Sequence, residues 1–138
     1  MKYLADTCVL SELLRKNPEP KVVRWMDERE LMTHLSVLTL GELQKGVAKL
    51  PDSKRKEQIQ TWIDRNLLER FDGRIIPVDS EIASTWGRIT GEAESQGRKL
   101  PVIDSLIAAT AVSRNLIVVT RNMQDLTGCG AHVINPWE

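Results

Sequence analysis

The chain has 138 residues, which predicts a single domain over residues 1–138, and its 19 basic residues balance 19 acidic ones. A hydrophobic fraction of 41% suits a folded globule and excludes an intrinsically disordered chain. The balanced charge neither favours nor excludes nucleic acid as a ligand, because binding needs a local basic patch rather than a net charge.

The first half of the chain alternates short apolar runs with helical patterns. Residues 2–5 read as a strand, and Thr7 is expected to cap a helix that ends at the proline-rich segment 17–20. A second helix precedes a strand at residues 32–35. Ser36 is then a suitable cap for a third helix, which carries Leu40, Leu43, Val47 and Leu50 at helical spacing.

The second half continues the alternation. A fourth helix is expected to begin at Asp52 or Ser53, and Pro77 interrupts a strand over residues 74–78, which favours an edge position. Asp79 or Ser80 caps the next helix. The remaining elements are a helix over residues 102–114 closed by Asn115, a strand over residues 116–120 and a last strand over residues 132–134.

This order of elements predicts the fold class. Strands separated by helices indicate right-handed crossovers, and therefore a central parallel sheet between two helical layers, a three-layer α/β/α sandwich. In the strand over residues 116–120, the run at residues 116–119 is continuously apolar, which indicates burial on both faces. The ligand site of such a sheet lies beyond the carboxyl ends of its strands.

Four carboxylates stand at or near that edge. Asp6 and Asp125 follow predicted strands, Asp125 in a loop or short turn, while Glu42 and Asp104 lie on helices that reach the edge. Each has an ordinary explanation: a turn or cap for Asp6, a solvated surface for Glu42, the helix dipole for Asp104. Because Thr7 can cap its helix, Asp6 is expected to be free. Together, the four acids favour a hard divalent cation, and Asn122 is a neutral alternative to Asp125.

Other kinds of site are disfavoured. Cys8 and Cys129 form no CxxC motif, which favours reduced thiols in a cytoplasmic protein over a zinc site, and no N-terminal segment resembles a secretion signal. The longest aliphatic run, residues 116–119, is far shorter than the ~20 residues of a membrane span. A phospho-acceptor receiver domain needs an acidic pair after the first strand, and a nucleotide-binding module needs a glycine-rich loop there. The chain has neither.

Four strings occur in order along the chain: DTCVLSELLRKNPEP, LSVLTLGEL, GRKLPVIDSLIAATA and VVTRNMQDL. With the NPW-like tail at residues 135–137, they resemble, from end to end, a PIN-domain ribonuclease of the VapC toxin type. The resemblance implies an α/β/α sandwich with an acidic pocket that binds Mg²⁺ or Mn²⁺. It identifies Asp6, Glu42, Asp104 and Asp125 as catalytic residues, with Asp6 and Asp104 as metal ligands.

The resemblance also implies supporting residues. Thr7 and Thr120 match hydroxyl positions that orient the carboxylates, and Asn122 occupies the place of the fourth acid in some relatives. Cys8 is a departure, because relatives usually carry asparagine there. That asparagine is expected to brace the turn that holds Asp6, so the site of this chain is expected to differ slightly in geometry, with no ligand lost.

The implied substrate is single-stranded or looped RNA, cut by metal-assisted hydrolysis of a phosphodiester bond. The implied partners are a second copy of the chain, in a homodimer, and a small cognate antitoxin that blocks the acidic pocket. Apolar residues of the first two helices are candidate antitoxin contacts, although core packing explains them equally well: Val9, Leu13, Trp25 and Met26. The alternative function is a catalytically silent PIN-like scaffold that acts only through its antitoxin complex.

Overall fold

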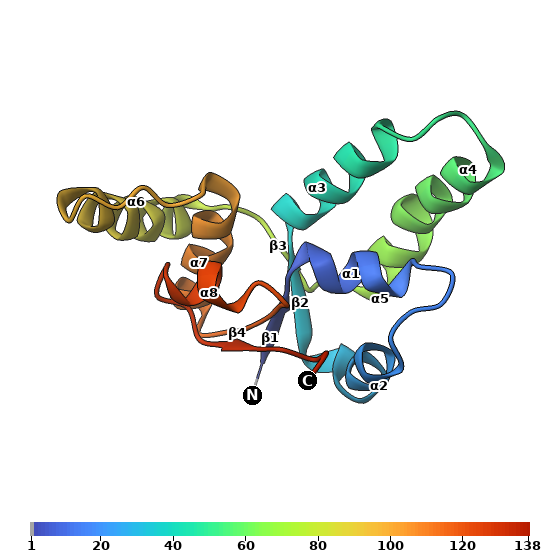
Figure 1. Ribbon diagram of the computed structural model, residues 1–138, viewed down its shortest axis with the longest axis horizontal. Helices are drawn as coiled ribbons and strands as arrows, with labels where there is room; N and C mark the ends of the chain where they lie inside the picture. Colours follow the sequence, from blue (N-terminus) through green and yellow to red (C-terminus); the bar gives the residue numbers. More distant parts are fainter. Residues whose placement is uncertain (1) are drawn as a thin grey trace.

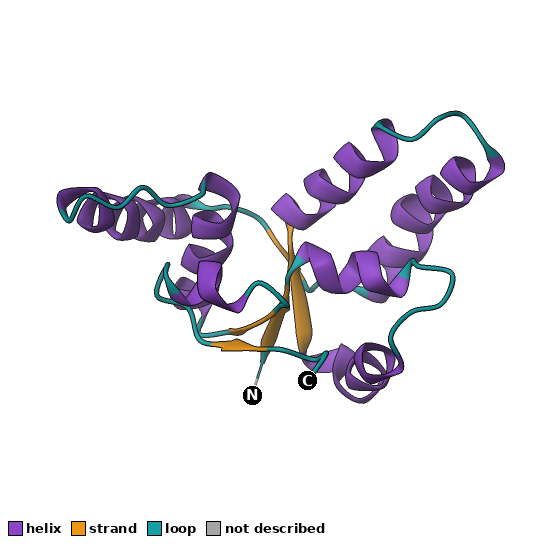
Figure 2. Ribbon diagram, in the orientation of Figure 1, coloured by secondary structure: helices purple, strands orange, loops and turns teal. Residues whose placement is uncertain are grey.

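Five short parallel strands form the centre of the computed structural model, which describes residues 2–138 (Figures 1 and 2). Their order across the sheet is β3-β2-β1-β4-β5, and every neighbouring pair is parallel. The strands are β1 (Tyr3–Ala5), β2 (Thr33–Ser36), β3 (Ile75–Ile76), β4 (Ile117–Val119) and β5 (Val133–Ile134). The predicted parallel sheet is confirmed.

Helices cover both faces of this sheet. In Figure 1, α1 to α5 lie on one side of the strands, and α6, α7 and α8 lie on the other. The first group is α1 (Thr7–Leu13), α2 (Pro20–Arg29), the 3-10 turn η1 (Glu30–Met32), α3 (Val37–Ala48), α4 (Lys54–Thr61), the π-helical stretch η2 (Trp62–Leu67) and α5 (Leu68–Arg70). The second is α6 (Ser80–Ser95), α7 (Val102–Arg114) and α8 (Met123–Thr127). The three-layer α/β/α sandwich is therefore confirmed.

The central strands contribute to two separate hydrophobic cores. Successive side chains of a strand point to opposite faces of the sheet. Accordingly, Tyr3 and Val119 belong to the core beneath α1, α2 and α3, whereas Leu4 and Val118 belong to the core beneath α7 and α8. The burial of β4 on both faces is confirmed, and the site-bearing strands are fixed by packing from both sides.

The predicted caps are confirmed at several helix starts. Ser36 accepts a hydrogen bond from the backbone N–H of Leu38 at 3.0 Å, which begins α3 at the carboxyl end of β2. Ser53 caps α4 and Asp79 caps α6 in the same way. Asn115, with φ 56°, adopts the left-handed conformation that closes α7.

The ends of the sheet differ from the sequence-based ranges. The strand expected over residues 74–78 is reduced to Ile75–Ile76, and it lies at an edge of the sheet, as Pro77 predicts. The other edge strand, β5, also has two residues and is followed closely by Pro136. No helix within residues 2–138 is both long and apolar enough to cross a membrane.

Two of the four candidate antitoxin contacts are core residues. Val9 is 0% exposed and Met26 is 1% exposed, so neither can reach a partner without unfolding. Leu13 and Trp25 are only partly buried against the same core. The apolar periodicity of α1 and α2 thus mainly serves internal packing.

Candidate active site

The edge formed by the carboxyl ends of β1 and β4 brings together the first two site residues. Ala5 is paired with Val119, so the residues that follow them, Asp6 and Thr120, are neighbours in space. The Thr120 hydroxyl donates a hydrogen bond to Oδ2 of Asp6 at 2.9 Å. This hydrogen bond holds the carboxylate of Asp6 in place. Because Asp6 is only 5% exposed, the carboxylate is also largely removed from water.

Asp6, rather than Thr7, caps α1. Oδ1 of Asp6 accepts a hydrogen bond from the backbone N–H of Thr7 at 2.8 Å, so the expectation that Thr7 caps the helix and leaves Asp6 free is wrong. The extended backbone at Asp6 places its carboxylate beside the first N–H groups of the helix. The hydroxyl of Thr7 instead donates a hydrogen bond to Oε1 of Glu42, across 35 positions of sequence.

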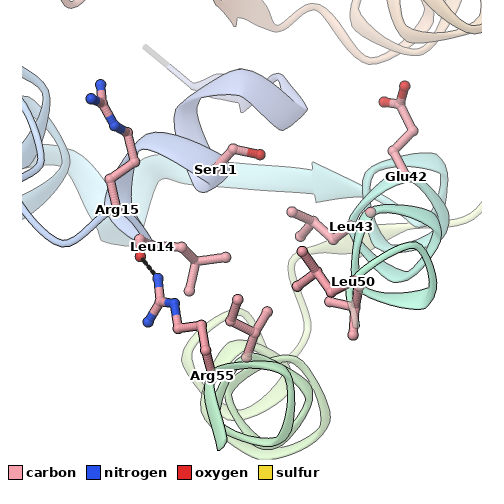
Figure 3. A pocket seen from close by; sticks show the side chains of 10 residues that line it. Ser11, Leu14, Arg15, Glu42, Leu43, Leu50 and Arg55 are labelled. Carbon is pink, nitrogen blue, oxygen red and sulfur yellow. Dashed lines mark hydrogen bonds between the residues drawn. The ribbon is translucent and has the colours of Figure 1, made fainter. Parts of the chain in front are cut away.

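Glu42 comes from α3. Because Ser36 caps this helix at the end of β2, Glu42 lies in its second turn and remains near the same edge of the sheet. Its side chain is half-buried. Figure 3 shows its carboxylate turned away from the apolar side chains of Leu43 and Leu50.

Asp104 lies in the first turn of α7. Burial, followed by the negative charges of Asp6, Asp125 and Glu42, raises the pKa of its carboxyl above the ordinary aspartate range. Asp6, Asp125 and Glu42 therefore all lie within electrostatic range of Asp104. Every charge that shifts this pKa is negative.

The fourth position lies in a short helix. Asp125 was expected in a loop or turn, but residues 123–127 form α8, so that prediction is wrong. Asn122 precedes this helix, and its backbone N–H donates a hydrogen bond to the Thr120 hydroxyl at 2.9 Å. Both Asn122 and Asp125 are exposed, and only Asp125 adds charge to the neighbourhood of Asp104.

Cys8 links the two strand ends. Its Sγ lies 3.5 Å from the Thr120 hydroxyl and accepts a hydrogen bond from the backbone N–H of Arg121 at 3.5 Å. Burial is the main cause that raises the pKa of this thiol, with a smaller contribution from the charge of Asp6. Both cysteines are free, and through these contacts Cys8 joins the turn after β1 to the turn after β4.

The donor chemistry of this neighbourhood fits a hard divalent cation. Its side-chain donors are carboxylate and hydroxyl oxygens, which Mg²⁺ and Mn²⁺ prefer. Asp6 is buried without an ion-pair partner among residues 2–138, and a buried carboxylate is costly unless a positive charge meets it. Across the same residues, no three acid, histidine or cysteine side chains stand close enough to form a preassembled cage.

Two clefts flank Glu42, one on each side of α3. The first, shown in Figure 3, is an apolar pocket of about 250 Å³ between α1, α3 and α4. Arg15 and Arg55 stand at its rim, and the guanidinium of Arg55 donates a hydrogen bond to the carbonyl of Leu14. The second, of about 530 Å³, lies between α3 and Ile103 of α7. The sequence held no signal for either, because each needs helices from distant segments to pack.

Comparison with known proteins agrees with this geometry. The PIN domain family model matches residues 3–124. Toxin FitB of Neisseria gonorrhoeae is 37% identical over 135 residues, which are 97% of each chain. VapC ribonuclease Y4jK of Sinorhizobium fredii is 34% identical over 134 residues, 96% of each chain.

A solved structure of FitAB bound to an IR36 DNA fragment superposes with a TM-score of 0.90 and 35% identity, over 99% of this chain and 96% of that chain. The sequence resemblance is thus confirmed at the level of both sequence and fold. The chain belongs to the PIN-domain family, and within it to the group of VapC-type proteins.

Proposed function

We propose that this chain is a divalent-metal-dependent ribonuclease and the toxin of a type II toxin–antitoxin pair. The observation that carries the proposal is that the hydroxyls of Thr120 and Thr7 hold the carboxylates of Asp6 and Glu42 at one edge of the sheet. Burial, and then the charges of Asp6, Asp125 and Glu42, also raise the pKa of Asp104. Negative charges gathered at one edge of a sheet repel one another and destabilise the fold unless a bound cation neutralises them. The relatives named as a toxin and as a VapC ribonuclease support this reading.

Asp6 and Asp104 are the metal ligands of this proposal, and Glu42 and Asp125 complete the acidic site. A bound Mg²⁺ or Mn²⁺ would supply an activated water and charge stabilisation on the scissile phosphate. The chain's own hydroxyl groups orient the ligands: Thr120 holds one oxygen of Asp6, and Thr7 holds one oxygen of Glu42. The charge that Asp125 adds near Asp104 favours it over Asn122 as the fourth acid.

RNA is the proposed substrate, and the bond cut is a phosphodiester. None of the contacts described at this site involves His34 or His132, so a mechanism that relies on two histidines as acid and base has no support in its geometry. A small site of this kind cannot read a long sequence, so selectivity depends on presenting a single-stranded or looped segment of RNA.

A cognate antitoxin is the proposed protein partner. The structure of FitAB on DNA supports such a partner. The apolar pocket of Figure 3 opens beside Glu42, so a partner segment seated there would also stand over the acidic site. We also infer a homodimer, and a cytoplasmic location, where RNA is at hand and the free thiols of Cys8 and Cys129 stay reduced.

The test is cleavage of total cellular RNA by the purified chain with Mg²⁺ or Mn²⁺, with chelator, and by the Asp104→Asn variant. Discrete products that require metal and vanish in the variant are expected. Asparagine keeps the size and shape of the side chain but removes its charge, so the fold is retained. Equal products from both proteins would refute the assignment of Asp104. A pure, antitoxin-free chain that cuts no RNA would favour the silent scaffold.

A further inference from the structure

The larger cleft beside Glu42 has the chemistry of a nucleic-acid groove. It is about 530 Å³ in volume and runs along α3, with Ile103 of α7 on its far side. Glu42, Lys45 and Lys49 follow one another along it at spacings of three and four residues, which places them on one face of the helix. The cleft therefore leads from the acidic site to two positive charges.

Within residues 2–138, neither lysine is engaged by another charged side chain. Lys45 and Lys49 are both exposed, and among residues 2–138 neither takes part in an ion pair. Lysines in the last turn of a helix do complement the helix dipole. That role explains a contribution to stability but not why the two side chains line a cleft shared with Glu42.

The floor of the cleft is open at two glycines. Gly41 and Gly46 lie inside α3 and line the cleft on either side of Glu42 in sequence. A Cβ at either position would meet nothing within 4 Å, so no packing inside the chain requires a glycine there. Glycine inside a helix is destabilising relative to alanine. These two glycines leave the backbone of α3 open to close approach by a molecule outside the chain.

The remaining wall is apolar. Val37 is 37% exposed and lines the cleft together with Leu38 and Ile103. Aliphatic side chains and lysines in one cleft suit a polymer with a charged backbone and flat, apolar faces. Single-stranded nucleic acid is such a polymer, because its phosphates meet cations while its bases lie on less polar surfaces.

We propose that this cleft is the RNA-binding groove of the enzyme, in which Lys45 and Lys49 hold backbone phosphates on one side of the scissile bond. This inference rests on the proposed ribonuclease function and extends it from the acidic site to the path of the substrate. The lysines are positioning residues: they set where RNA lies relative to Glu42 and take no part in the chemistry.

The test measures binding of fluorescently labelled single-stranded RNA of mixed sequence to the full chain carrying Asp104→Asn, by anisotropy across a salt series. Each phosphate contact on single-stranded nucleic acid contributes about 0.7 to the slope of log affinity against log salt. Adding Lys45→Ala and Lys49→Ala should therefore lower that slope by about 1.4 and weaken binding. Arginine at both positions should restore the slope.

A charge-matched control is Lys21→Ala with Lys54→Ala, two exposed lysines that do not line this cleft. The control should keep the parent slope. An equal loss in the control, an unchanged slope in the Lys45/Lys49 variant, or no RNA binding by the parent would overturn the inference. An unchanged slope together with a changed oligomeric state would assign the cleft to a second copy of the chain instead.

A kinetic readout separates positioning from chemistry. In the active chain, Lys45→Ala with Lys49→Ala should raise KM and leave kcat nearly unchanged, which is the signature of lost substrate binding. Because binding is measured on an inactive variant, a chain that bound RNA through these lysines but cleaved nothing would refute the proposed function and leave the groove assignment standing.

Discussion

Replacement of Gly41 by alanine should stabilise the protein and impair it at the same time. Gly41 lies in the interior of α3, is exposed, and has open space where a Cβ would stand. The substitution should therefore raise the free energy of unfolding by the full difference in helix propensity between glycine and alanine, about 0.8–1 kcal/mol. For a domain of this size, that gain corresponds to a rise in Tm of roughly 3–5 °C.

The same methyl group narrows the cleft next to Glu42, so kcat/KM for RNA should fall several-fold. Thermal and urea unfolding followed by circular dichroism measure the first effect, and cleavage of a defined RNA measures the second. Gly91→Ala is the matched control. Gly91 lies inside α6, is exposed, has equally open space, and lines neither cleft beside Glu42. It should gain similar stability with unchanged activity.

Two results would refute this reasoning. A lower Tm for Gly41→Ala would mean that the position packs tightly against something, such as a second copy of the chain. A higher Tm with unchanged kcat/KM would mean that RNA does not approach α3 at this point. A substrate groove requires that Gly41→Ala raises Tm and lowers kcat/KM. It also requires that Gly91→Ala raises Tm and leaves kcat/KM unchanged.

Further outcomes follow from the acidic site. Mg²⁺ or Mn²⁺ at 100 times its dissociation constant should stabilise the chain by about 2.7 kcal/mol in thermal melts. Asp6→Asn should reduce that shift, and a full shift in this variant would contradict its role as a ligand. With chelator present, the wild type should lose stability relative to Asp104→Asn as pH rises through the folded-state pKa of Asp104. The reason is that the pKa of Asp104 is raised in the fold, so its ionised form is less favourable there than in the unfolded chain. Parallel pH profiles for the two proteins would argue against the repulsion. Thr120→Val removes a hydrogen bond to the Asp6 carboxylate and the acceptor for the Asn122 N–H, so it should cost about 1.5–3 kcal/mol in urea unfolding. Thr120→Ser, which keeps the hydroxyl, should retain most of that stability.

Features fixed by neighbouring residues were predictable from the sequence. Ser36, Ser53 and Asp79 cap helices because their side chains reach a backbone N–H two or three residues ahead. Asn115 closes α7 for an equally local reason. The parallel sheet followed from the alternation of strands and helices, which leaves few other topologies.

Features that depend on contacts between distant segments were not predictable from the sequence. The sequence offered both Asp6 and Thr7 as caps, and the choice between them depends on Glu42, which accepts the Thr7 hydroxyl from another helix. The placement of Asp125 in a helix depends on a turn too short to show a periodic pattern. The clefts beside Glu42 form only when α1, α3, α4 and α7 pack together, so the sequence of any one segment cannot predict them.

The two-residue strands at both margins of the sheet limit how this chain can associate. An exposed strand edge is a template for open-ended pairing, and short edges closed by proline are a recognised protection against aggregation. Here β3 is followed at once by Pro77, and β5 is followed two residues later by Pro136. Sheet extension from copy to copy is thereby discouraged on either side. Contacts with a second copy or with an antitoxin are left to the helical faces, which favours closed, finite complexes over fibres.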